Sequence, residues 1–535
     1  MSALNVSHEL RRHAAAAPGR LAVHVFGRAE ERLTFEQLER RVDSIAWALA
    51  DLGLRPGERT ALFVPPGVDF VALFHALLRL GALPVLIDPG MGRRALLACL
   101  ARVQPSALIG VPRVHLARQL FPQRFRNVGL AIAVGRGPAL GAVRLERLLG
   151  ARSEPFPIVP VTTATPAAVL FTSGSTGPAK GVVHTHGNFA AELVALRTHF
   201  GLEPGEVDGA CFPLFALFDH ALGLTSVFPE LDPTRPAQCD PARVHHALEA
   251  GRASFAFGSP AIWRRVVPWM QARGARFTQL RRVTIAGAPV SPRLALALKA
   301  LLPAGGEVHT PYGATEALPV SDINAGQLAG LRAAIESGAG SAVGRPLPGV
   351  ELALIRVTDE PIARWDEGLR VAPGAPGEVC VRGAMVTARY LDDERANALA
   401  KIPDPAGVWH RMGDVGRLDA AGMLWFLGRK SHRLETEHGV LYPVPLENVL
   451  DATPGVARTA LVGAGPRGQE RPVLLVERDG AGLPLKELLP RVAARARELD
   501  PPIREVLLHP RFPTDVRHNA KIRREELKRW AERRV

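Results

Sequence analysis

The chain has 535 residues, of which 47% are hydrophobic and 22% are charged. This length exceeds one ordinary hydrophobic core, so we expect two or more domains, and the composition is that of a globular protein rather than a disordered one. The net charge of +14 comes from basic residues scattered along a sequence with few aromatic residues and no recognised nucleic-acid module. We therefore expect no nucleic-acid binding.

The sequence contains no predicted membrane span or export signal. Residues 1–20 lack a basic start followed by a continuous apolar core, and their pattern predicts an amphipathic helix. The most apolar long stretch, Phe63–Pro89, is interrupted by Asp69, His75 and Arg79. The four cysteines are far apart and form no Cys-x-x-Cys pair. We expect a reduced cytoplasmic protein without structural zinc.

The first 150 residues alternate between short apolar runs and helical patterns. This rhythm predicts a parallel, doubly wound α/β sheet. The expected strands are Thr60–Val64, Leu83–Ile87 and Ala107–Gly110, and the expected helices are Glu36–Leu52, Val68–Leu80 and Arg93–Arg102.

A loop rich in glycine and hydroxyl residues, Thr172–Gly181, follows the predicted strand Ala167–Phe171. Inward-facing N–H groups, hydroxyls and a lysine suit a polyphosphate, although the loop is not a Walker A motif. A helix is expected to run to Phe200, with Asn188 as its N-cap. The candidate phosphate-binding residues are Thr172, Ser173, Gly174, Ser175, Thr176, Gly177 and Lys180.

Three further loops follow predicted strands and are expected to meet at one crevice, because ligands bind beyond the carboxyl ends of such strands. These loops are Phe257-Gly258, Gly287-Ala288-Pro289 and Tyr312-Gly313-Ala314-Thr315-Glu316. The hydroxyl and carboxylate of Thr315 and Glu316 suit phosphate and Mg2+, and the Tyr312 ring suits stacking on a purine.

From Gly344 the pattern changes to short strands with Gly and Pro turns, which predicts a small β-rich subdomain. Asp414 and Arg429 are candidates for binding ribose hydroxyls. A polar stretch around residues 428–433 suggests a domain boundary before a final α+β segment. That segment ends in a basic helix, Arg523–Arg534, and Lys521 lies just before it.

These patterns occur in one order that resembles the adenylate-forming superfamily, which contains acyl-CoA synthetases, luciferases and nonribosomal adenylation domains. The matching segments are Thr172–Gly181, Tyr312–Glu316, Gly413-Asp414, Gly428-Arg429 and Ala520-Lys521-Ile522. The resemblance implies an N-terminal adenylation domain (1–427), a hinge (428–432) and a mobile C-terminal lid (433–535). It also implies ATP-dependent activation of a carboxylic acid, in which the protein positions groups and neutralises charge.

The same resemblance assigns a role to each matching residue. Ser173–Lys180 hold the β- and γ-phosphates, and Thr315 contacts phosphate. Glu316 holds Mg2+, and Asp414 with Arg429 holds ribose. Lys521 bridges the carboxylate and the α-phosphate as the catalytic lysine.

Two departures from the usual pattern place the chain closer to one subfamily. Ala216 follows Pro213-Leu214-Phe215 where acyl-CoA synthetases commonly have histidine, and His432 replaces the hinge aspartate. These segments resemble the β-lactone synthetases of bacterial long-chain olefin biosynthesis, which adenylate a 2-alkyl-3-hydroxy fatty acid and close a lactone without CoA. That resemblance implies a cytoplasmic complex with a β-lactone decarboxylase, a ketoreductase and a thiolase-like condensing enzyme.

Several alternatives stay open at this point. The enzyme alternative is a long-chain fatty acyl-CoA or acyl-AMP ligase, and the alternative from another class is a non-catalytic nucleotide sensor. His432 is either a base for the 3-hydroxyl or a hinge hydrogen-bonding residue. The aromatic and small residues Phe215, Phe218, Phe257 and Gly258 either shape an acyl pocket or belong to the core.

Overall fold

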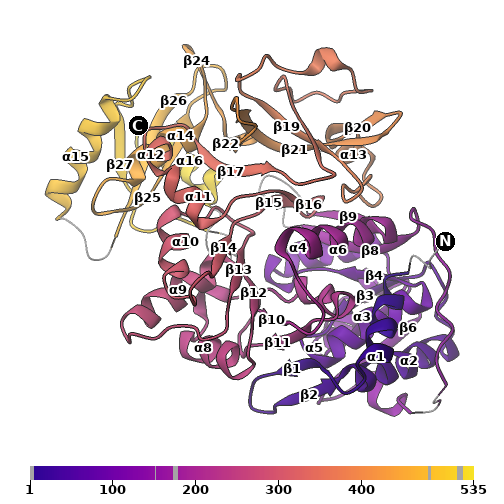
Figure 1. Ribbon diagram of the computed structural model, residues 1–535. Helices are drawn as coiled ribbons and strands as arrows, with labels where there is room; N and C mark the ends of the chain where they lie inside the picture. The colour runs from indigo at the N-terminus through magenta and orange to yellow at the C-terminus, as the bar shows by residue number, and fades with distance from the viewer. Residues whose placement is uncertain (1–4, 151, 153, 173–178, 480–483, 515–521) are drawn as a thin grey trace.

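The computed structural model describes the chain except for residues 1–4, 151, 153, 173–178, 480–483 and 515–521. The first of its sheets has seven strands in the order β7-β6-β5-β3-β4-β8-β9 (Figure 1). All neighbours are parallel except the last pair, β8 and β9, which form a hairpin around the predicted phosphate loop. Its strands are β3 (Arg59–Phe63), β4 (Leu83–Leu86), β5 (Ala107–Gly110), β6 (Leu130–Ala133), β7 (Val143–Arg144), β8 (Pro166–Thr172) and β9 (Lys180–Thr185).

The second sheet also has seven strands, in the order β14-β13-β12-β10-β11-β1-β2. It is parallel except for the β1–β2 pair. The carboxyl ends of β12, β13 and β14 therefore lie at one edge, where the predicted ligand-binding loops begin. Its strands are β1 (Leu21–Val25), β2 (Glu31–Thr34), β10 (Val207–Ala210), β11 (Thr225–Phe228), β12 (Phe255–Gly258), β13 (Arg282–Ile285) and β14 (Glu307–His309).

Helices cover these sheets and join them through one large apolar core. The most buried is α3 (Val68–Leu80), which is apolar on nearly every side. The buried positive charge of its Arg79 is compensated by ion pairs with Glu39 and Asp43 of α2. The other helices of this part are α1 (Ser7–Ala16), α2 (Phe35–Asp51), α4 (Arg93–Val103), α5 (Pro112–Leu120), α6 (His186–Phe200), α7 (Asp219–Leu222), α8 (Pro241–Ala250), α9 (Pro260–Gln271) and α10 (Pro292–Lys299).

An antiparallel eight-stranded sheet follows, in the upper part of Figure 1, with the order β15-β16-β17-β22-β21-β19-β18 and β20 paired to β21. Three helices, α11 (Ala325–Gly330), α12 (Arg332–Glu336) and α13 (Glu394–Ala400), belong to this region. The strands are β15 (Tyr312–Ala314), β16 (Ala317–Asp322), β17 (Ser341–Pro346), β18 (Glu351–Ile355), β19 (Gly377–Arg382), β20 (Lys401–Asp404), β21 (Gly407–Leu418) and β22 (Leu424–Arg429).

The last part of the chain is a smaller α+β unit, drawn in yellow in Figure 1. It contains the hairpin β23–β24 and the three-stranded sheet β25-β26-β27, whose helices α14, α15 and α16 carry two separate small cores. The elements are β23 (Leu434–Thr436), β24 (Gly439–Leu441), α14 (Pro443–Asp451), β25 (Val456–Ala464), β26 (Arg471–Arg478), α15 (Leu485–Arg497), β27 (Glu505–Leu508) and α16 (Arg524–Glu532).

The architecture confirms the predicted α/β fold class, with doubly wound sheets in a large N-terminal part and a smaller C-terminal unit. The β-rich region is larger than expected, because it begins with Tyr312 rather than near Gly344. The expected N-cap of α6 was wrong. Thr185 caps the helix, and Asn188 is the third helical residue, whose side chain accepts a bond from the Thr185 N–H (3.0 Å) in a capping box.

Two expectations, on membrane-spanning helices and on the cysteines, can be compared with the described residues. Across that part of the chain, no helix combines the length and apolar character needed to cross a bilayer. None of the four cysteines forms a disulfide, and all four are buried. Burial raises the pKa of the Cys99 thiol to about 11, which keeps it protonated and unreactive at neutral pH.

Candidate active site

The predicted pair Thr315-Glu316 forms the two-residue turn of the hairpin β15–β16, in which Ala314 pairs with Ala317. Glu316 is buried in spite of lying at a turn. The hairpin is tight at Gly313, where an added Cβ would lie 2.6 Å from the carbonyl oxygen of Ala317. Only glycine allows this close approach, so the motif fixes where the carboxylate of Glu316 points.

Residues from a distant segment hold Glu316 in place. The Tyr390 hydroxyl donates a 2.7 Å hydrogen bond to Oε1 of Glu316. Thr387 donates from both its N–H (2.9 Å) and its hydroxyl (3.1 Å) to the backbone carbonyl of Glu316. Lys401 in turn donates from Nζ to the carbonyl of Thr387. The Tyr390 bond ends on Oε1, and a hydrogen bond from the backbone of Glu316 also favours the charged carboxylate.

The electrostatic surroundings keep Glu316 ionised. Burial opposes this, but the pKa of Glu316 is lowered because the protonated forms of His410 and Lys401 and the Tyr390 hydrogen bond favour the carboxylate. Burial lowers the pKa of His410 to about 3, so this imidazole is uncharged at neutral pH. Burial also lowers the pKa of Lys401 to about 7, against the attraction of Glu316. Lys401 is thus only partly protonated at neutral pH, and its charged form is stabilised by the Glu316 carboxylate.

The same segment connects the hairpin to the predicted phosphate loop. Tyr390 forms a β-bridge with Val182 of β9, and the N–H of Leu391 donates to the carbonyl of Gly181 (2.7 Å). The Nζ of Lys180 lies 5.0 Å from the centre of the Tyr390 ring. The structure therefore brings Lys180 and Glu316, which are 136 positions apart in sequence, to one tyrosine, with Lys180 over its ring and Glu316 at its hydroxyl.

A second cluster joins three predicted nucleotide-binding residues. The Tyr312 hydroxyl donates to Oδ2 of Asp414 (2.7 Å), and Nη1 of Arg429 lies 3.1 Å from Oδ1 of the same carboxylate. Asp414 and Arg429 face each other as register partners on β21 and β22. The Asp414 carboxylate raises the pKa of Arg429, so the guanidinium stays charged at neutral pH.

The remaining nucleotide-binding candidates have different outcomes. Gly287, Ala288 and Pro289 follow β13 at the edge shared with β12 and β14, and Gly287 adopts a positive φ of 92°. Thr172 ends β8. Ser173, Gly174, Ser175, Thr176, Gly177 and Lys521 lie outside the described residues.

The acyl-pocket candidates form a closed aromatic group. The rings of Phe215 and Phe257 stack with their centres 3.9 Å apart, and Phe218 packs edge-on against Phe215. At Gly258 an added Cβ would lie 2.7 Å from the indole nitrogen of Trp263. A cavity of about 20 Å³ borders Phe218, which is room for about one water molecule. A long alkyl chain therefore enters here only if aromatic side chains move.

His432 lies in the short 3-10 helix Lys430–His432 after β22. Burial lowers its pKa to about 3, with added repulsion from Arg524 and Arg429. In this arrangement the imidazole is uncharged and a weak base. Nearby, Lys430 bonds the carbonyl of Thr358 (2.9 Å) and pairs with Glu378 of β19 (3.0 Å), so this short helix is attached to the antiparallel sheet.

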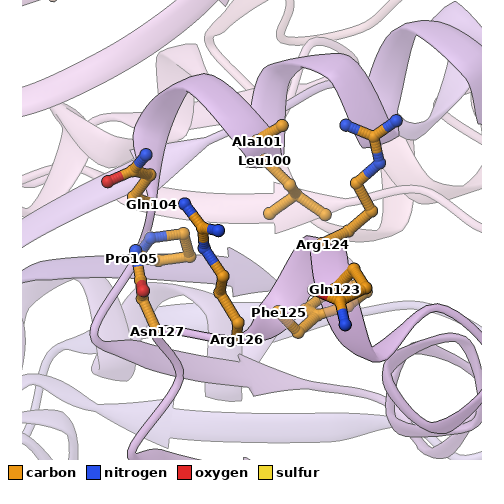
Figure 2. Close-up of a pocket in the computed structure, with 9 residues that line it drawn as sticks. All are labelled: Leu100, Ala101, Gln104, Pro105, Gln123, Arg124, Phe125, Arg126 and Asn127. Atoms are coloured by element: carbon orange, nitrogen blue, oxygen red, sulfur yellow. The ribbon is translucent and has the colours of Figure 1, made fainter.

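A separate hollow of about 340 Å³ lies between the end of α4 and the segment Pro122–Phe125 (Figure 2). Exposed Arg124 and Arg126 and several amides line it, and it includes no carboxylate and none of the predicted site residues. It therefore lacks the acidic group that the candidate chemistry requires.

Sequence reasoning missed Thr387, Tyr390, Lys401 and His410. One signal for Tyr390 was present in the sequence. The chain has only three tyrosines, so each of them was a candidate for a role in the site. Two of them, Tyr312 and Tyr390, donate to the two carboxylates that the motifs identify.

Comparisons with known proteins agree with this geometry. Residues 10–391 match the profile of the family described as AMP-binding enzyme. An olefin beta-lactone synthetase from Stenotrophomonas maltophilia is 43% identical over 98% of both chains. Another, from Xanthomonas campestris, is 41% identical over 98% of this chain and 97% of its own. Among solved structures, the amide bond synthetase McbA from Marinactinospora thermotolerans superposes with a TM-score of 0.81, at 25% identity over 98% of this chain and 99% of its own.

Proposed function

The chain belongs to the AMP-binding enzyme family, and we propose that it is a β-lactone synthetase acting on long-chain 2-alkyl-3-hydroxy fatty acids. The family membership supports ATP-dependent adenylation. The near full-length similarity to two olefin beta-lactone synthetases supports the choice of product. The observation that carries the proposal is the ionised, buried Glu316 at the hairpin tip, beside the Tyr312–Asp414–Arg429 cluster.

In the first step, a carboxylate oxygen of the fatty acid attacks the α-phosphorus of ATP and pyrophosphate leaves. Asp414 and Arg429 would bind the ribose, while Thr315, Lys180 and the loop 173–178 would contact the phosphates. Lys521 would neutralise charge that develops between the carboxylate and the α-phosphate. These roles come from the motifs, and the clustering of Tyr312, Asp414 and Arg429 supports the ribose site.

Glu316 fits the binding of Mg2+, which prefers oxygen ligands. Its buried carboxylate has a lowered pKa and is therefore ionised at neutral pH. The cation would neutralise phosphate charge when bound. Tyr390 would hold Oε1 and so orient the carboxylate.

In the second step, the 3-hydroxyl oxygen attacks the carbonyl carbon of the acyl adenylate. The hydroxyl proton passes to solvent, AMP leaves with the bridging oxygen and the bonding electrons, and a four-membered lactone forms. Ring strain opposes closure, while the internal nucleophile and the activated leaving group favour it. Ala216, in place of a histidine common in acyl-CoA synthetases, supports a reaction without CoA.

The proposed division into domain 1–427, hinge 428–432 and lid 433–535 would allow the lid to bring Lys521 to the site and later withdraw it. His432 belongs to that hinge. Its low basicity in this arrangement favours a hinge role over that of a base. His432→Ala separates the two, because loss of lactone closure with intact adenylation would identify a base.

The surrounding pathway is also part of the proposal. A β-lactone product requires a decarboxylase to consume it, and a 3-hydroxy acid requires a ketoreductase and a thiolase-like condensing enzyme to supply it. We propose that these enzymes form a cytoplasmic complex with this chain.

The test is incubation of the purified chain with a 2-alkyl-3-hydroxy acid, ATP and Mg2+, without CoA. The proposal expects β-lactone, AMP and pyrophosphate in equal amounts. The matched acid without the 3-hydroxyl should give adenylate and no lactone. Strict dependence on CoA would instead identify an acyl-CoA ligase, and stable acyl adenylate from both acids would identify an acyl-AMP ligase. Absence of acid-dependent ATP–pyrophosphate exchange would favour a nucleotide sensor.

A further inference from the structure

Three metal-ligating side chains meet at the base of the hairpin, away from its Thr315-Glu316 tip. Nε2 of His199 lies 2.9 Å from Oδ2 of Asp322, and Nδ1 of His309 lies 2.6 Å from the same oxygen. All three ligand atoms lie within 4.8 Å of one another. They come from α6, β14 and β16, so the fold and not a local motif brings them together.

The carboxylate of Asp322 is in an unusual position for a surface ion pair. Its side chain is only 4% exposed, and in the described chain its ion-pair partners are these two histidines, with no lysine or arginine. Its second oxygen, Oδ1, is buried without a hydrogen-bond partner there. A buried carboxylate needs a compensating positive charge, and a bound metal ion would supply it.

The histidines are oriented for a shared ligand. The Phe200 ring packs edge-on against His199 (4.8 Å) and His309 (5.3 Å), which restricts both imidazoles. His199 lies in the last turn of α6, where the helix dipole favours a cation. The exposed side of His199 leaves room for solvent to supply a further ligand.

We propose that His199, His309 and Asp322 bind a divalent transition metal ion, with Zn2+ as the preferred ion. Two imidazoles and one carboxylate are common zinc ligands, with bonds of about 2.0–2.2 Å. Tetrahedral bonds of this length place ligand atoms about 3.3–3.6 Å apart, so the separations of 2.6 and 2.9 Å would open by roughly 0.4–1.0 Å as metal bonds replace hydrogen bonds. The earlier expectation of no structural zinc was based on cysteine spacing, which says nothing about this ligand set.

The site would attach the base of the β15–β16 hairpin to α6 and β14. Ser321, next to Asp322, pairs with Tyr312, and the Thr310 N–H bonds the Ile323 carbonyl (2.9 Å). The metal would therefore stabilise β16, the strand that follows Glu316, without touching the reacting groups. This inference does not depend on which acid the enzyme activates.

The experiment is a titration of tag-free, metal-free protein with Co2+ and then Zn2+, without ATP. Four-coordinate Co2+ bound through nitrogen has visible absorption that oxygen-bound Co2+ at Glu316 lacks. We expect one Co2+ per chain with this absorption, displaced by one Zn2+. His199→Gln should weaken binding at least about 100-fold, as should Asp322→Asn. Exposed His438→Gln and the active-site variant Glu316→Gln should leave it unchanged.

Two results would overturn the proposal. One is a wild-type protein that takes up no stoichiometric Co2+ or Zn2+ at neutral pH, which would leave a hydrogen-bonded His–Asp–His group. The other is undiminished uptake by His199→Gln, which would place the metal elsewhere. Because His199 is exposed, this variant is expected to fold, and its circular dichroism compared with His438→Gln verifies that.

Discussion

Replacing Tyr390 with phenylalanine removes one hydrogen bond to Glu316 and keeps the aromatic ring. The bond is 2.7 Å long and ends on a buried carboxylate. Hydrogen bonds to charged groups contribute about 1.5–3 kcal/mol, which corresponds to a roughly 10- to 150-fold loss in kcat/KM for ATP. The ring keeps its contacts with Lys180 (5.0 Å) and Lys401 (5.3 Å), so the change isolates the hydroxyl.

Steady-state kinetics of ATP–pyrophosphate exchange over a range of Mg2+ concentrations measures this effect. We expect the loss to be partly recovered at high Mg2+, because Tyr390 acts by orienting a metal ligand. Tyr442→Phe is the matched control, since it removes the same hydroxyl from the remaining tyrosine outside the two clusters. A loss below about threefold, or less than ~0.7 kcal/mol, would refute the role assigned to the Tyr390 hydroxyl.

Three further outcomes are expected. Burial lowers the pKa of His186 to about 4, so the unfolded chain binds a proton first and stability is lost as the pH falls from 6.5 toward 4. His186 should account for about 2 kcal/mol of that loss between pH 7 and pH 5, and urea unfolding that is equally pH-dependent in His186→Gln would contradict it. Asp414→Asn should raise KM for ATP by roughly 10- to 100-fold with a smaller change in kcat, because its carboxylate bonds Tyr312 and Arg429; an unchanged KM would remove Asp414 from nucleotide binding. Lys521→Ala should slow adenylation by about 10²–10³ while ATP still binds, and exchange at the wild-type rate would exclude its catalytic role.

Contiguous motifs could be predicted from the sequence, because the residues that shape the backbone turn and the residues that carry the chemistry are neighbours in the chain. The Tyr312–Glu316 segment is an example, since Gly313 permits the tight hairpin that positions Glu316. The alternating apolar runs also predicted the strands well, and α3 has the predicted bounds Val68–Leu80.

The partners of Glu316 could not be predicted in this way. Tyr390 and Lys401 are 74 and 85 positions away, and pairing between separate strands brings them to the carboxylate. The prediction of the N-cap of α6 failed for a related reason. Thr185 and Asn188 are both good capping residues, and the end of β9 at Thr185 decides which one starts the helix.

The acyl pocket was the hardest part to predict, because aromatic residues serve both cores and ligand sites. Phe215 and Phe257 stack on each other and belong to the main core. The sequence contains no signal for the ring movements that an alkyl chain would require.

The most direct test of the central claim follows oxygen atoms through one reaction. A 2-alkyl-3-hydroxy acid labelled with 18O at both carboxylate oxygens is converted with ATP and Mg2+, without CoA, and the products are analysed by mass spectrometry. Closure through an acyl adenylate predicts one 18O in AMP and one in the lactone carbonyl, with the ring oxygen unlabelled. Lactone that retains both labels, with unlabelled AMP, would show that the carboxylate had attacked C3 and would contradict the account.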